Sequence, residues 1–451
     1  MTLKAKITIQ PMPDLTFNDT NEMIFPKKFH AWKLHNKMLT ISFGHGKFEV
    51  RCKIHEEDED TLFCSHTLAK QLLLPHLPTP LSISYQRENN YMSFGPVFAV
   101  LTAFKNKQNP ISFPAINDFC IELASFCKQH GLFFYVFSLD EFNDNEVYGY
   151  TYSNQMWQKH QLPKPNVIYN RIHSRIIERS ELAQRLFTQC KEQEIPYFNN
   201  RFLNKWEVHQ MLSSELHLKL HLPETAIFSS KRSFANLVNN YECIYVKPIY
   251  GSQGRHIYRI TNENDTYSLE NSGFTSTDKL TFKNDSDLFH FLKQKISKKK
   301  YIVQQGINLY EHKGRTVDFR VLCNRNYNGE WFNSSIMARL STPKTFVSNV
   351  AQGGELYKPE DVLSMYAKKE RDQFIKALQE LALELCLQVS KNFEGDYGEL
   401  GVDLALDKKG NIWIIEINIK PSKDLDDQIT SLKVRPSAKA ILQFGSFLAN
   451  H

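Results

Sequence analysis

The chain has 451 residues, with 55 lysines and arginines against 49 aspartates and glutamates, and a net charge of +6. This length predicts two or three domains with more than one core. No segment reaches the roughly 20 apolar residues of a membrane helix, and the N-terminus lacks the apolar core of a signal peptide. The basic residues are dispersed, which argues against nucleic-acid binding.

The cysteines are scattered and form no close Cys-x-x-Cys pair. They are Cys52, Cys64, Cys120, Cys127, Cys190, Cys243, Cys323 and Cys386. Several have apolar neighbours in the sequence, which is typical of buried thiols. Reduced cysteines in a cytoplasmic protein are therefore expected, and neither a disulfide framework nor a zinc site.

Residues 1–105 are predicted to form an N-terminal β-rich domain. Short apolar runs at 39–43, 47–54, 81–85 and 97–101 alternate with polar turns, a spacing typical of strands. One short helix is expected near Ser65–Leu72.

Residues 106–196 are predicted to form an α/β domain. A helix over Ala115–His130 leads through a glycine to the apolar strand Leu132–Phe137. A second strand is expected over Pro165–Asn170, and a second helix over Arg175–Glu194.

Residues 197–451 are predicted to form a third domain, which contains nearly all of the chemical motifs. Its expected helices span Lys205–Leu218, Asp285–Lys299 and Lys369–Asn392. The last of these has apolar residues at helical spacing, so one face packs on a core. Segments 318–323 and 330–339 are expected to form a hairpin.

A lysine and a glycine loop follow the predicted strand 241–246. Lys247 lies at the end of that strand, and the loop consists of Gly251, Ser252, Gln253 and Gly254. A lysine in this position can reach phosphate oxygens, and glycines let the backbone N–H groups approach them. The loop is not a Walker A motif, because the lysine precedes the glycines.

Two arginines are expected on neighbouring strands of the hairpin. Arg320 and Arg339 can together hold an anionic transition state or a substrate carboxylate. The glycine-rich turn that follows contains Asn349, which can bind an anion or a substrate amide. The other interpretation is that both arginines are surface residues whose stems pack on aromatic rings.

Three oxygen-bearing side chains mark a second hairpin near the C-terminus. Asp403 lies on its first strand, a turn spans 407–411, and Glu416 and Asn418 lie two residues apart on its second strand. Residues two apart on a strand point to the same face. Two carboxylates and an amide form an oxygen-only site that suits Mg²⁺.

The ordered set of motifs resembles the ATP-grasp superfamily, and within it the glutathione synthetase and ribosomal-protein glutamate ligase branch. Three stretches look more specifically like the YheC/YheD family of spore-coat-associated proteins: Val167–Ile172, Phe198–Glu207 and Val246–Ser252. The resemblance implies an α+β fold. Two α+β ATP-grasp subdomains would follow an α/β pre-ATP-grasp domain and the N-terminal β-rich domain.

The resemblance also implies cofactors and residue roles. ATP would be bound by Lys205, Lys247, the loop Gly251–Gly254, the hinge residues Gln304, Gln305 and Ile307, and Glu311 at the ribose. Mg²⁺ would be held by Asp403, Glu416 and Asn418. Arg320, Arg339 and Asn349 would act on the substrate. Histidines such as His209 are expected to be structural.

The implied reaction joins a carboxylate to an amine through an acylphosphate. The partners would be small-molecule or peptide substrates and spore-coat proteins, with the protein in the cytoplasm at the forming spore surface. Gly401 stands where the D-alanine ligase branch has arginine, and Lys420-Pro421-Ser422 departs from the glutamate ligases. Two alternatives stay open: a structural coat protein that binds ATP without turnover, and phosphoryl transfer without ligation.

Overall fold

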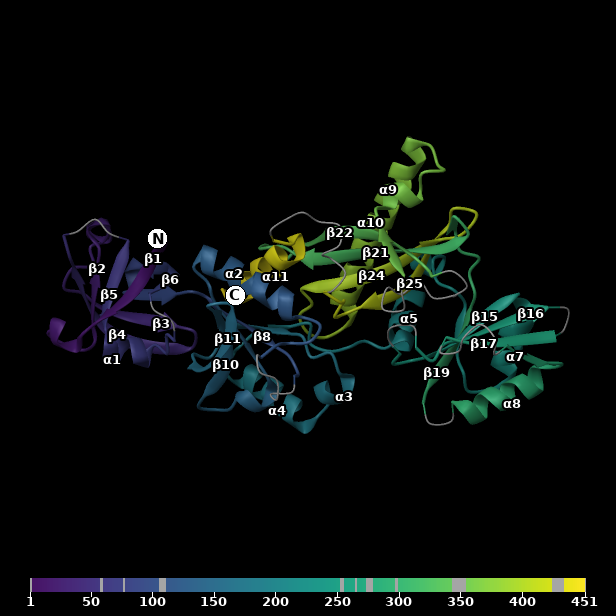
Figure 1. Cartoon of the computed structure of the whole chain (residues 1–451), viewed down its shortest axis with the longest axis horizontal. Helices are drawn as coiled ribbons and strands as arrows, with labels where there is room; N and C mark the ends of the chain where they lie inside the picture. Colours follow the sequence, from purple (N-terminus) through teal and green to yellow (C-terminus); the bar gives the residue numbers. More distant parts are fainter. Residues whose placement is uncertain are drawn as a thin grey trace.

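The computed structural model describes residues 2–56, 60–75, 78–104, 111–251, 255–263, 266–272, 279–296, 299–342, 354–423 and 434–450. Ser252, Gln253, Gly254 and Asn349, which the sequence nominates as site residues, lie outside these ranges. The molecule is elongated, with a barrel at one end and two sheets around the predicted site at the other (Figure 1).

The first strands form a closed barrel in the order β1-β5-β2-β4-β3-β7-β6, with β6 pairing back onto β1. The strands are β1 (Thr2–Met12), β2 (Glu22–Phe25), β3 (Met38–Phe43), β4 (Gly46–Ile54), β5 (Thr61–Ser65), β6 (Thr79–Gln86) and β7 (Tyr91–Phe94). The expected short helix is α1 (His66–Gln71), where the Ser65 hydroxyl accepts from the Leu68 N–H. Inward residues such as Ile7, Ile9 and Ile41 are fully buried, so the barrel is filled by side chains.

The second sheet has the order β11-β10-β9-β8-β12-β13. Its strands are β8 (Val97–Leu101), β9 (Phe133–Phe137), β10 (Val147–Ser153), β11 (Met156–Leu162), β12 (Val167–Asn170) and β13 (Tyr197–Phe198). The central strands β8, β9 and β12 pair in parallel and are buried throughout. Such uniform apolar strands need cover on both faces.

The helices of this region differ in one place from the expectation. The helix expected at 115–130 is α2 (Asn117–His130). The prediction of a single helix over 175–194 is wrong, because this segment forms two helices, α3 (Arg175–Glu178) and α4 (Glu181–Glu192). The Ser180 hydroxyl accepts from the Ala183 N–H, so a new helix start interrupts the pattern.

The second sheet is also covered by a helix from the far end of the sequence. Helix α11 (Pro436–Leu448) contacts α2 and β12 as well as strands β21 and β22 described below. Its Ile441, Leu442 and Phe444 belong to the same buried core as Phe98 and Tyr169. Figure 1 shows α11 and the C-terminus beside α2.

The third sheet is antiparallel, in the order β14-β19-β15-β16-β17-β18. Its strands are β14 (Thr225–Ile227), β15 (Cys243–Pro248), β16 (Tyr258–Glu263), β17 (Thr266–Asn271), β18 (Leu280–Phe282) and β19 (Tyr301–Gln305). Helices α7 (Lys231–Asn240) and α8 (Asp285–Lys295) pack on it through Phe234, Leu237, Leu288 and Leu292. The side chain of Asn284 caps α8.

The fourth sheet has the order β23-β22-β21-β24-β25, and β20 (Glu311–His312) pairs with β21. Its strands are β21 (Arg315–Arg325), β22 (Trp331–Leu340), β23 (Glu355–Tyr357), β24 (Glu399–Leu406) and β25 (Ile412–Asn418). Helix α10 (Lys368–Asn392) buries Leu378, Leu385 and Val389 against it, preceded by α9 (Pro359–Val362). Helices α5 (Lys205–Ser213) and α6 (Leu216–Lys219) lead into the third sheet.

A buried ionic cluster joins the second sheet to the fourth. The Glu399 carboxylate is inaccessible to solvent and lies 3.6 Å from the Arg171 guanidinium, also pairing with Lys423. The Tyr169 hydroxyl donates to it at 2.7 Å. Burial raises the pKa of Glu399, but the cations lower it more, so the net pKa lies below its ordinary value.

Candidate active site

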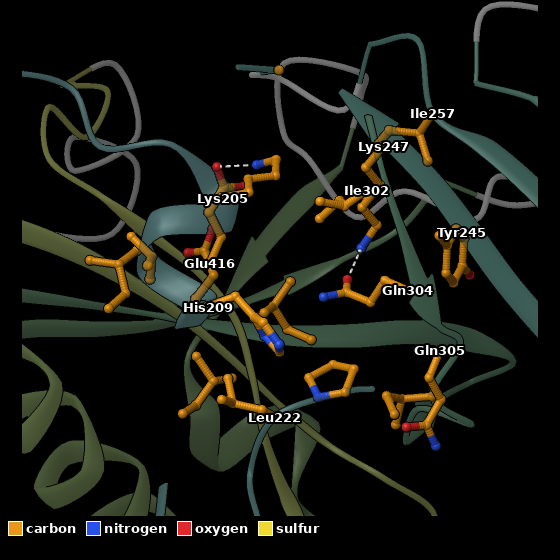
Figure 2. Close-up of a pocket in the computed structure, with 18 of the residues that line it drawn as sticks. Lys205, His209, Leu222, Tyr245, Lys247, Ile257, Ile302, Gln304, Gln305 and Glu416 are labelled. Atoms are coloured by element: carbon orange, nitrogen blue, oxygen red, sulfur yellow. Dashed lines mark hydrogen bonds and ion pairs between the residues drawn. The ribbon is translucent and has the colours of Figure 1, made fainter. Parts of the chain in front are cut away.

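A cavity of about 200 Å³ lies between the third and fourth sheets and is closed on one side by α5 (Figure 2). Its wall includes Lys205, His209, Tyr245, Lys247, Gly251, Gln304, Gln305, Ile307, Arg339, Asp403 and Glu416. Residues that lie far apart in the sequence therefore meet because two sheets and one helix face the same space.

Lys247 stands on β15 beside the hinge strand β19. Its Nζ donates to Gln304 Oε1 at 2.7 Å, across paired strands (Figure 2). Burial lowers the pKa of Lys247 to about 8, and the nearby Lys205 ammonium adds to this lowering. Because this hydrogen-bond partner is a neutral amide, the ammonium keeps its charge available for an anion in the cavity.

Nucleotide affinity should fall as the pH rises above about 8. Below that pH the free Lys247 is protonated. Above it, binding a phosphate requires proton uptake, so affinity should drop by about tenfold between pH 8 and 9.5. Calorimetry of Mg-ADP binding at several pH values, in two buffers of different ionisation enthalpy, measures both changes. Lys247→Arg should flatten the profile; an unchanged slope in that variant would contradict the assignment.

Lys205 is fixed at the start of α5. The Asn204 side chain accepts from the N–H groups of Trp206 and Glu207, and Glu207 caps the Asn204 N–H in return. This capping box sets the direction of the first helical turn. Lys205 Nζ then pairs with Glu416 Oε1 of β25 at 2.5 Å, which links the helix to the fourth sheet (Figure 2).

The two predicted arginines form a paired cluster with two aspartates. Strand register sets Arg320 opposite Asp403 and Asp318 opposite Arg339. Arg320 Nη2 donates to Asp403 at 2.9 Å, and Arg339 lies 2.5 Å from Asp318 and 3.1 Å from Asp403. Burial raises the pKa of Asp403, but the two guanidiniums lower this pKa by more than burial raises it. The net pKa lies below its ordinary value, so the carboxylate is ionised.

Asp403, Glu416 and Asn418 lie on one face of the hairpin β24–β25. Asp403 is opposite Glu416, and Gly401 is opposite Asn418. The Asn418 amide donates to Asp403 at 3.1 Å. In the described ranges no three His, Cys, Asp or Glu side chains cluster to bind a metal. Two carboxylates and an amide nevertheless fit Mg²⁺, which takes one or two carboxylates when phosphates supply other ligands.

The hinge residues differ in what they offer the cavity. The Gln305 and Gly306 N–H groups donate to the carbonyls of Glu224 and Cys243, both at 2.8 Å. Ile307 lies on the wall. Glu311 pairs with Lys408 at 3.1 Å and does not appear on the cavity wall in the described structure.

Several wall residues were not predicted from the sequence, among them His209 and Tyr245. His209 was expected to be structural, yet it lies on the cavity wall and stacks on Trp206, with centroids 5.5 Å apart. Its spacing of four residues from Lys205 places both on one helical face, and this signal could have identified it. Tyr245 precedes Lys247 by two residues on β15 and shares its face for the same reason.

The chain resembles known proteins over most of its length. The YheC/D-like ATP-grasp family matches residues 194–448, more than half of the chain. The endospore coat-associated protein YheD of Bacillus subtilis (strain 168) is 29% identical over 394 residues, covering 86% of this chain and 85% of YheD. YheC, an endospore coat-associated protein of the same organism, is 22% identical over 331 residues. That alignment covers 71% of this chain and 88% of YheC.

Among solved structures, the VanG D-Ala:D-Ser ligase from Enterococcus faecalis aligns with a TM-score of 0.46 and 12% identity, over 78% of this chain and 99% of the ligase. The predicted α+β ATP-grasp fold and β-rich N-terminal region are confirmed. The chain belongs to the YheC/D-like ATP-grasp family.

Proposed function

We propose that this protein is an ATP- and Mg²⁺-dependent ligase that joins a carboxylate to an amine and releases ADP and phosphate. The main support is the cavity where Lys205, Lys247 and Glu416 meet. Ammonium groups beside carboxylates suit a metal-bound triphosphate. Membership of the ATP-grasp family agrees with this chemistry.

The nucleotide would lie with its base at the apolar part of the cavity and its phosphates at the lysines. The apolar wall includes Leu222, Pro223, Ile302 and Ile414. These side chains suit a flat purine ring, with the hinge 304–307 beside it. Lys205 and Lys247 would bind the α- and β-phosphates, and Gly251 begins the loop that would cover them.

In the proposed reaction a substrate carboxylate oxygen attacks the γ-phosphorus of ATP. An O–P bond forms, and the bond to ADP breaks. An amine nitrogen then attacks the acyl carbon, forms the C–N bond, expels phosphate and loses a proton. Arg339, on the cavity wall, and Arg320 are the candidates that offset the charge of the approaching anions, with Asn349 at the substrate. Mg²⁺ held by Asp403, Glu416 and Asn418 would neutralise phosphate charge.

The proposed substrates are small molecules or peptides, in the cytoplasm at the surface of a forming spore. The support is the pair of relatives described as endospore coat-associated. Within the described residues, no helix is long and apolar enough to cross a membrane.

A second candidate is a coat-associated protein that binds ATP without turnover. One observation favours it: Arg320 and Arg339 both pair with Asp403, and Arg339 also with Asp318. Guanidiniums neutralised in this way stabilise an approaching anion less than free ones do.

Release of ADP by the purified protein tests the two candidates. The protein is incubated with Mg-ATP and with pools of amino acids, peptides or cell-wall precursors, and products are identified by mass spectrometry. A ligase should release ADP only with a suitable pool, and Lys247→Met should abolish this release. Tight Mg-ATP binding with no stimulation by any pool would instead support binding without turnover.

A further inference from the structure

The proposed reaction needs positive charge at its reacting end, and the cluster at Asp403 supplies little of it. Two cations, Arg320 and Arg339, face two anions, Asp403 and Asp318, within ion-pair distance. The net charge of these four groups is zero. An additional cation at the same end of the cavity would therefore have a clear use.

Arg175 lies beside the cavity, behind the wall residue Gly251, although it comes from the preceding domain. It begins α3 and lies outside the residues 194–448 matched by the ATP-grasp family. Its Nη1 donates to the carbonyl of Tyr250, the residue before Gly251 on the cavity wall. Its guanidinium packs over the rings of Phe202 and Tyr250, at 4.8 and 5.9 Å from their centroids.

The Arg175 guanidinium has donor capacity that the described residues leave unused. Its Nε is buried without a hydrogen-bond partner, and the two carboxylates that influence it, Glu416 and Glu178, form their ion pairs with Lys205 and Lys420. Burial lowers the pKa of Arg175, and Glu416 is the carboxylate that offsets this most. Geometry places the side chain near the metal candidates as well: the Phe202 ring centroid lies 4.8 Å from the Arg175 guanidinium and 4.7 Å from Nζ of Lys420, which follows the strand β25. A buried N–H donor without a partner is costly unless a ligand satisfies it.

Helix α3 is anchored to the segment that follows strand β25. Lys420, two residues beyond Asn418, donates to the Ile172 carbonyl at 3.2 Å and pairs with Glu178. Glu178, the last residue of α3, also accepts from the Phe202 N–H at 3.0 Å. These bonds fix the short helix from both ends, so Arg175 is held in place before any ligand binds.

We propose that Arg175 binds an oxyanion at the reacting end of the cavity, either the γ-phosphoryl group of ATP or the substrate carboxylate. This assignment rests on the proposed function and makes the preceding domain part of the active site. Both anions offer the same chemistry to a guanidinium, namely oxygen atoms that accept charge-assisted hydrogen bonds. Lys420 and Glu178 would act as positioning residues.

The test compares wild type with Arg175→Met, Arg175→Lys and the control Arg185→Met. Arg185 is an exposed arginine of α4 that pairs with Glu181. Calorimetry measures the affinity for Mg-ADP, for Mg-AMP-PNP, and for acetate added to the Mg-AMP-PNP complex. Arg175→Met should keep its affinity for Mg-ADP and lose about tenfold in one of the other two. Arg175→Lys should recover part of the loss, and Arg185→Met should match wild type.

The outcomes separate the two anions. A loss for Mg-AMP-PNP identifies the γ-phosphoryl group, and a loss confined to acetate identifies the carboxylate. Unchanged affinity for both Mg-AMP-PNP and acetate in Arg175→Met would overturn the inference. An equal loss of affinity for Mg-ADP and Mg-AMP-PNP would also overturn it, because it would indicate that Arg175 only supports Tyr250. Absence of Mg-ADP binding by wild type would instead refute the proposed function itself.

Discussion

Replacing Glu416 by glutamine should weaken nucleotide binding about 10- to 100-fold when Mg²⁺ is present. The amide keeps the shape of the side chain but removes one of the two carboxylates proposed to bind the metal. Without Mg²⁺ the same change should leave affinity unchanged or improve it, because Lys205 loses its anionic partner and repulsion of phosphate falls. Calorimetry with and without EDTA measures these opposite effects.

Glu416 is a better probe than Asp403 for a structural reason. The Glu416 side chain is 29% exposed, whereas Asp403 is buried against Arg320 and Arg339. Removing Asp403 would leave buried guanidiniums without a counter-charge and destabilise the fold. A loss of binding could then come either from the lost metal ligand or from the destabilised fold. Glu380→Gln, at an exposed glutamate of α10, is the control. Equal affinity of Glu416→Gln and wild type in Mg²⁺ would refute the metal assignment.

Replacing Glu399 by glutamine should lower the free energy of unfolding by about 3–5 kcal/mol, because Arg171 and Lys423 would stay buried without a counter-charge. Urea unfolding followed by circular dichroism measures the loss. The Glu399 pKa is lowered on folding, so its contribution is present above the ordinary pKa near 4.5 and is lost as the pH falls through the folded-state pKa. The difference from the variant should shrink accordingly at low pH.

An exposed glutamate provides the control for this experiment. The Glu181 side chain is 81% exposed and pairs with Arg185 on the same helix. Glu181→Gln should change stability by no more than about 0.5 kcal/mol. Similar small losses in both variants would show that the buried cluster is not a stabilising contact between the second and fourth sheets.

Local sequence patterns were enough to predict much of the fold. The hairpin β24–β25 follows from alternating apolar residues around the turn at Gly410, where φ is +85°. The long helix α10 follows from apolar residues at helical spacing. Both features depend on residues that lie close together in the sequence, so a single sequence shows the pattern directly.

Contacts between distant segments could not be predicted in this way. Arg320 meets Asp403 only because β24 pairs with β21 after an excursion of about eighty residues through β22, β23 and α10. Nothing local specifies that neighbour, so the arginines looked free to meet a substrate. The break between α3 and α4 was missed for another reason, because Ser180 is compatible with a helix interior until its hydroxyl caps the next helix.

Helix α11 has a consequence for the growing chain on the ribosome. The second sheet leaves the ribosome early, but Ile441, Leu442 and Phe444, which complete its core, come last. Residues 199–435 take roughly 10–50 s to synthesise at about 5–20 residues per second. During that time the apolar core that α2 shares with α11 lacks the part of its cover that α11 supplies. The exposed part is the surface that a nascent-chain chaperone would have to shield.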